Sequence, residues 1–267
     1  MSAGGSSGAG PVAAHAARTR GVDGAWRSRA AWLVLVAAVV LGVGLDLASK
    51  SWAFSSLADS PVVVERSDAL AKIRAGVPLN HPEPIAELRE AGAPRALWEP
   101  ILPRHEPAVV VPYVLEFKLV LNAGAVFGSG QGKRWLFVGF TFVALVFCGY
   151  LFAAWSGSRD WLAHASIGLV VAGGLGNLYD RLVFGCVRDF LHPLPGVRWP
   201  FGWEVLGGRE VWPYVSNVAD ALLLIGIGVL LVKLWRTGDA GGGGRADEEA
   251  SEQAGVEKPS GGANDGA

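Results

Sequence analysis

Four long apolar segments constrain the fold of this chain more than any other feature. They lie at residues 30–52, 135–155, 161–180 and 213–235. Each is about the length of helix, roughly 20 residues, that crosses the hydrocarbon core of a bilayer. Charged residues make up only 18% of the chain, below the quarter or so that is typical of soluble domains. We therefore expect an all-α membrane protein with four transmembrane helices.

The basic residues predict which side of the membrane each loop occupies. Seven basic residues that flank the spans fall on one side of a four-span arrangement: Arg18, Arg20, Arg27, Arg29, Arg159, Lys233 and Arg236. Lys133 and Arg134 argue for the opposite orientation but are outnumbered. By the positive-inside rule, both termini should be cytoplasmic. The first segment also has features of a cleaved signal peptide, but Asp46 and Lys50 precede any plausible cleavage position, which favours a spanning helix.

The segments outside the spans divide into tails and an outer region. Residues 1–25 and 237–267 are rich in small and polar residues without apolar periodicity, which predicts disordered cytoplasmic tails around one domain at residues 26–236. Residues 67–97 indicate one or two short polar helices interrupted by prolines. Alternation in residues 108–127 predicts strands. We expect a small extracytoplasmic β-sheet and a further extracytoplasmic insertion at about residues 59–109.

Two aspartates lie at the ends of apolar segments, where an unpaired carboxylate is costly. Asp189 follows the third segment and Asp220 lies within the fourth. An ionisable group in such a place is a functional-site hypothesis. If the two carboxyl groups meet, they would share a proton and could activate water. A helix cap or an ion pair with Arg181 or Arg188 is the structural alternative, and spacing alone leaves the two interpretations even.

Other polar residues are spaced to support such a pair. Asn177, Asp180 and Arg181 share one face if the third helix continues through them, and Asn217 stands in the same relation to Asp220. Amides and a guanidinium there could orient carboxyl groups or bind substrate carbonyls. Hydrogen bonding between helices is the alternative, and it is favoured for any one of these residues taken alone.

Two further sites have mainly structural interpretations. Asp46 and Lys50 are one helical turn apart, so they could form an ion pair with Lys50 extending to the membrane interface. Contact with a lipid headgroup or with substrate is the lesser alternative. Asn122 and Gly124 lie where a strand enters glycine-rich chain, which suits either a tight turn or close approach of a ligand backbone.

Several classes of site are not indicated. His192 follows Asp189 by three residues, but no second histidine supports a zinc site, so no metal or cofactor is expected. No basic aromatic stripe suggests nucleic acid. Cys148 and Cys186 are far apart and suggest neither a disulfide framework nor a metal cluster.

Five short motifs occur in an order that resembles one family. They are D-x-x-S-K from Asp46, N-A-G-A-V-F-G from Asn122, G-G-L-G-N-L-Y-D-R from Gly173, V-R-D-F from Val187 and N-V-A-D from Asn217. Together, over roughly residues 30–235, the chain resembles lipoprotein signal peptidase, the type II signal peptidase of bacteria. The resemblance implies a multi-pass aspartyl endopeptidase of the bacterial cytoplasmic (inner) membrane. Its substrates would be diacylglyceryl prolipoproteins, cut just before the lipidated cysteine.

The resemblance also assigns roles to residues. It places the catalytic dyad on Asp189 and Asp220, and it assigns Asp180 to a supporting motif. The substrate-binding or supporting residues would be Asn122, Gly124, Asn177, Asp180, Arg181, Asn217, Asp46 and Lys50. It implies no metal and inhibition by the cyclic peptide globomycin. We expect a monomer.

Some features depart from the family pattern or fit other functions. Residues 59–109 look like an insertion, residues 191–211 lengthen the link between the aspartates, and Ser216 and Ala221 replace an aromatic residue and a serine that are usual in the family. The two insertions lie on the outer side, so they should alter access or substrate choice rather than chemistry. A proton-coupled transporter and a membrane scaffold that presents the insertion are the rival functions, but both leave the five ordered motifs unexplained.

Overall fold

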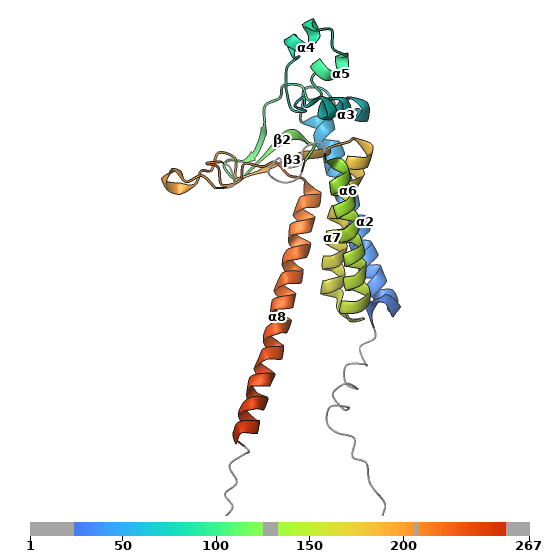
Figure 1. Ribbon diagram of the computed structural model, residues 1–267, viewed down its shortest axis with the longest axis vertical. Coiled ribbons are helices and arrows are strands. Elements are labelled where there is room, and N and C mark those ends of the chain that lie inside the picture. Colours follow the sequence, from blue (N-terminus) through green and yellow to red (C-terminus); the bar gives the residue numbers. More distant parts are fainter. Residues whose placement is uncertain (1–23, 125–132, 206–207, 255–267) are drawn as a thin grey trace, which may run out of the picture.

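Four long helices form the body of the molecule (Figure 1). The computed structural model describes residues 24–124, 133–205 and 208–254, with side chains as far as residue 236. The helices are α2 (Arg29–Ser56), α6 (Arg134–Tyr150, continued by the π-helical η4, Leu151–Trp155), α7 (Trp161–Val183) and α8 (Val218–Ala254). Each contains a stretch long and apolar enough to cross a membrane. The predicted four-span architecture is confirmed.

Helix α7 lies at the centre of the bundle, in contact with α2, α6 and α8. Glycines permit its close packing. A Cβ atom added at Gly168 would lie 2.7 Å from the Cβ of Ala38 on α2, and one added at Gly226 of α8 would lie 2.7 Å from the carbonyl oxygen of Ser166. Small residues at such contacts let helix backbones approach each other, which is how helices associate in a lipid environment.

A small antiparallel sheet covers one end of the bundle (Figure 1). Its strands are β1 (Ala108–Val111), β2 (Leu115–Asn122) and β3 (Val187–Pro193), in the order β1-β2-β3. The sheet and the strands within residues 108–122 were predicted, whereas β3 was not. Asp189 therefore lies on a strand, directly opposite Val120 of β2.

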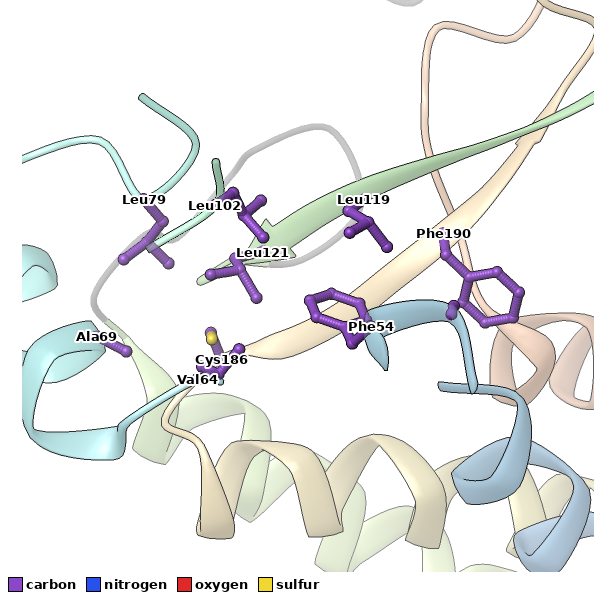
Figure 2. Packing of buried hydrophobic residues seen from close by; sticks show 10 residues of the cluster. Phe54, Val64, Ala69, Leu79, Leu102, Leu119, Leu121, Cys186 and Phe190 are labelled. Carbon is purple, nitrogen blue, oxygen red and sulfur yellow. The ribbon is translucent and has the colours of Figure 1, made fainter. Parts of the chain in front are cut away.

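The insertion packs on the sheet through Ala69 of its first helix and through the loop residues Leu79 and Leu102. It contains α3 (Arg66–Ala75), α4 (Ala86–Glu90) and α5 (Arg95–Trp98), three helices where one or two were expected. Figure 2 shows Leu79 and Leu102 of the insertion beside Leu121 of β2, in an apolar cluster that includes Phe54 from the C-terminal end of α2. The insertion thus shares a core with the sheet that carries Asp189.

Three predicted boundaries are wrong. Helix α8 begins at Val218 rather than near residue 213, because the preceding chain is extended and Ser216 pairs with Leu191 through backbone hydrogen bonds of 2.7 and 2.8 Å. The helix then continues through residues 237–254, where disorder was expected; residues 245–254 are rich in good helix formers, alanine and glutamate. Ala25 is buried and donates its N–H to the carbonyl oxygen of Ser156 at 3.1 Å, so Ala25 is an ordered part of the fold, although it was predicted to belong to the tail. Residues 1–23 and 255–267 lie outside the described part.

Candidate active site

One buried polar network gathers side chains from α2, β2, β3, α7 and the start of α8. Its members from the predicted set are Asp46, Lys50, Asn122, Gly124, Asn177, Asp180, Arg181, Asp189, Asn217 and Asp220. The side chains of Asp46, Lys50 and Asp180 are fully buried. The structure therefore brings all ten predicted residues to the sheet end of the bundle.

Two asparagines hold the carboxyl group of Asp189. Asn217 donates from Nδ2 to Oδ1 at 2.6 Å, and Asn122 donates from Nδ2 to Oδ2 at 3.1 Å. Asn122 reaches Asp189 because it lies two residues beyond Val120, on the same face of the sheet. The N–H of Gly124 donates to Oδ1 of Asn122 at 2.9 Å and so fixes which end of this amide faces Asp189.

The carboxyl group of Asp220 is held by Asn177 and by the helix start. Asn177 donates from Nδ2 to Oδ1 at 2.8 Å, and the N–H of Asn217 donates to Oδ2 at 3.2 Å. In return, Asp220 donates its N–H to Oδ1 of Asn217 at 3.1 Å, which completes a reciprocal capping box. Asn217 is therefore the capping residue directly before the helix. The spacing had suggested instead that Asn217 lies on a face of the helix. The cap considered as an alternative for Asp220 exists alongside its place in the network.

The amides of Asn177 and Asn217 link the two carboxyl groups. Asn217 donates from Nδ2 to Oδ1 of Asn177 at 3.1 Å, so one continuous chain joins Asp189 to Asp220. Burial raises the pKa of Asp189 to about 7, and the negative charge of Asp220 adds to this shift. Such a pKa is what two neighbouring carboxyl groups need in order to retain one proton near neutral pH.

The other two acids of the network are neutralised by cations. Asp46 accepts from Lys50 Nζ at 2.8 Å and from the N–H of Ala219 at 2.8 Å. Asp180 accepts from the N–H of Arg188 at 3.0 Å and from its Nη2 at 2.9 Å, with Lys50 Nζ at 3.5 Å. Arg188, considered earlier as a partner for the Asp189–Asp220 pair, binds Asp180 instead.

Asp189 and Asp220 differ from these acids in their partners. Within residues 24–124, 133–205 and 208–236, neither has a lysine or arginine at ion-pair distance. Arg181 donates to the carbonyl oxygens of Gly124 and Asn177 at 3.2 and 3.3 Å. The expectation that Lys50 extends to the interface is wrong, because its ammonium is held inside the network by Asp46.

Some contributors were not predicted. Ala219 acts through its backbone N–H at a helix start, which no side-chain pattern reveals. A Cβ atom at Gly176 would collide with the carboxyl group of Asp46, so this position requires glycine. In the sequence, the glycine directly before Asn177 was the available signal of this close contact. Residues 125–128 of the predicted turn motif lie outside the described part of the chain.

Comparisons with known proteins agree on one family. The family described as signal peptidase (SPase) II matches residues 95–236. A lipoprotein signal peptidase of Desulfitobacterium hafniense is 34% identical over 129 residues, which cover 48% of this chain and 73% of that protein. One from Methylobacterium sp. is 38% identical over 136 residues, with 49% and 72% covered, and one from Aquifex aeolicus is 37% identical over 132 residues, with 48% and 70% covered.

A solved structure described as a bacterial membrane enzyme at 2.3 Å resolution is 21% identical, with 76% of this chain and 87% of that chain covered. Its TM-score of 0.47 is too low to support a conclusion about the fold. The family match covers more than half of the chain, and these relatives are more than 30% identical to it over more than two thirds of their own length. The chain therefore belongs to the signal peptidase II family and is a multi-pass membrane peptidase.

Proposed function

We propose that this peptidase is an aspartic endopeptidase in which Asp189 and Asp220 together activate water. Its substrates would be diacylglyceryl prolipoproteins, cut just before the lipidated cysteine. The observation that carries the proposal is the contrast among the four acids of the network, of which Asp46, Asp180 and Asp189 are buried and Asp220 is half-buried. Asp46 and Asp180 have cationic partners, whereas Asp189 and Asp220 are held by amide and backbone N–H groups. Of these four acids, Asp189 and Asp220 are the two without a cationic partner among the described residues, which leaves them able to exchange a proton.

The chemistry follows from one proton shared by the pair. The ionised carboxylate accepts a proton from water as that water attacks the scissile carbonyl, while the protonated carboxyl donates its hydrogen bond to the carbonyl oxygen. Collapse of the tetrahedral intermediate transfers a proton to the leaving amine and breaks the C–N bond. Asn217 and Asn177 hold the two carboxyl groups in place during these steps. No covalent bond between enzyme and substrate forms.

The proposal includes roles for the supporting residues, an orientation in the membrane and an inhibitor. Asn122 ends β2, Gly124 lies two residues beyond it, and Arg181 of α7 donates to the carbonyl oxygen of Gly124. These residues would support the dyad or contact the substrate backbone. Residues 26–236 would form the peptidase domain, with both termini cytoplasmic and the sheet on the outer side of the inner membrane. The enzyme would act as a monomer, without a metal, and globomycin would inhibit it.

Purified protein in lipid nanodiscs would test the proposal with a diacylglyceryl prolipoprotein. Asp189→Asn and Asp220→Asn should each abolish cleavage while the protein remains inserted and folded. Asp59→Asn is the matched control, since Asp59 is an exposed aspartate outside the network. Wild-type cleavage should require the diacylglyceryl group and should stop on addition of globomycin. Cleavage that persists in both network variants would refute the aspartic mechanism.

A further inference from the structure

Along the edge of β2 that faces β1, side chains take the place of a strand beyond the end of β1. Alternate residues of a strand present their backbone groups to the same edge, and on β2 these include Phe117, Leu119 and Leu121. Strand β1 extends along this edge only as far as Phe117, which lies opposite Ala108. A strand edge would otherwise leave the N–H groups of Leu119 and Leu121 without partners.

Asn80 and His105, both from the outer region before β1, bond to these backbone groups. The amide of Asn80 accepts from the N–H of Leu121 at 2.7 Å and donates to its carbonyl oxygen at 3.0 Å. Nε2 of His105 accepts from the N–H of Leu119 at 3.0 Å. Nδ1 of His105 lies 3.0 Å from the carbonyl oxygen of Pro103, so Nδ1 carries the proton and Nε2 is the acceptor.

The C-terminal end of this edge is adjacent to the proposed catalytic dyad. Leu121 immediately precedes Asn122, whose amide donates to Oδ2 of Asp189 at 3.1 Å. The side chains of Leu119 and Leu121 are buried beneath the insertion, in the cluster of Figure 2. The end of β2 is thus held along its edge by hydrogen bonds and on one face by apolar packing.

We propose that Asn80 and His105 are positioning residues for peptide cleavage, which fix the end of β2 and thereby hold Asn122 against Asp189. The inference rests on the proposed dyad. Asn80 lies outside residues 95–236, the part that matches the family. The proposal therefore gives the insertion a role in catalysis that its position alone does not imply.

Kinetics of the full-length protein in nanodiscs test this role. Asn80→Ala should lower kcat about 10- to 100-fold, because small misplacements of a catalytic group have effects of this size, while KM is unchanged. His105→Ala should act in the same direction but less, since Leu119 is farther along the strand from Asn122. Lys72→Met is the control: Lys72 is buried in the insertion, but its Nζ bonds to Leu97 rather than to β2, at 2.7 Å. This variant should keep wild-type kcat even if it lowers the melting temperature.

A double-mutant cycle separates positioning from general destabilisation. If Asn80 acts through Asn122, Asn80→Ala should cause no further loss of kcat in an Asn122→Ala background. Additive losses, or wild-type kcat in Asn80→Ala, would overturn the inference. If Asn80→Ala does not fold, Asn80→Asp keeps the acceptor for the N–H of Leu121 but loses the donor, and the same cycle applies. Cleavage that persists in both Asp189→Asn and Asp220→Asn rejects the proposed aspartic mechanism, whereas loss of cleavage in these variants beside an unaffected Asn80→Ala rejects only the positioning role.

Discussion

Asn217 and Asp220 cap each other across the first turn of α8, with reciprocal hydrogen bonds of 3.2 and 3.1 Å between backbone N–H and side-chain oxygen. The same two side chains belong to the polar network, because Asn217 also donates to Asp189 and Asp220 also accepts from Asn177. The helix start and the proposed catalytic dyad are therefore one structure. The position of Asp220 is set by the cap that it helps to form.

This double role predicts that activity and stability can be separated at Asp220. Asp220→Asn keeps an oxygen that can accept from the N–H of Asn217, whereas Asp220→Ala keeps none. Both variants should be inactive, and the alanine variant should lose about 1 kcal/mol more unfolding free energy than the asparagine variant, the usual contribution of one hydrogen bond. Unfolding by titration with SDS, measured beside cleavage, distinguishes them. Equal destabilisation by both substitutions would show that the cap depends on the charge.

The spans and the network members could be predicted from the sequence because membrane physics limits the options. Only helices or closed barrels satisfy the backbone in lipid, so long apolar segments identify α2, α6, α7 and α8. The relation of Asn217 to Asp220 could not be resolved, because a spacing of three residues suits both a helical face and a capping box.

Strand β3 was missed for a different reason. Residues 187–190 are all buried, since one face of the strand meets the bundle and the other meets the insertion, so the strand lacks alternation of apolar and polar residues. The inward direction of Lys50 depends on Asp180, which is distant in the sequence. The spacing of Asp46 and Lys50 in the sequence indicated the ion pair, but not that both side chains are fully buried.

Two neighbouring glycines of α7 should respond differently to alanine. A Cβ atom at Gly176 would collide with the carboxyl group of Asp46 and lie 3.3 Å from the Cβ of Ala219, whereas one at Gly174 would make ordinary contacts of 3.6 Å with Thr141. Gly176→Ala should therefore lower both stability and cleavage. Gly174→Ala should retain cleavage and gain slight stability, because alanine favours helix. Melting temperature and kcat of the two variants provide the comparison; equal behaviour would show that Asp46 can move without consequence.

Cleavage should decline as the pH rises above about 7. Burial and the charge of Asp220 raise the pKa of Asp189 to about 7, so below this pH the pair retains a proton and above it the proton is lost. With both carboxyl groups ionised, none can polarise the scissile carbonyl. The hydrogen bond from Asn122 favours the ionised form. Asn122→Ala should therefore move the alkaline limb of kcat to higher pH, and a limb that stays in place would contradict this role of Asn122.

Lys50 should be the most stabilising cation of the site. Its ammonium is fully buried, 2.8 Å from Asp46 and 3.5 Å from Asp180, so Lys50→Met leaves two buried carboxyl groups short of a cation. Removing one partner of a buried pair costs about 3–5 kcal/mol. Adding Asp46→Asn should recover part of this loss, because it removes one unpaired charge, although Asp180 still lacks the contribution of Lys50.

Titration with SDS of the two single variants and the double variant measures this coupling. The exposed pair of Arg95 and Glu99 is the control, since its side chains are 75% and 41% accessible. Glu99→Gln should leave the unfolding free energy unchanged, because solvent screens surface ion pairs. If Lys50→Met were as mild as Glu99→Gln, the carboxyl groups around Lys50 would have to be protonated in the native protein, and the charge separation that leaves Asp189 and Asp220 without cations would no longer hold.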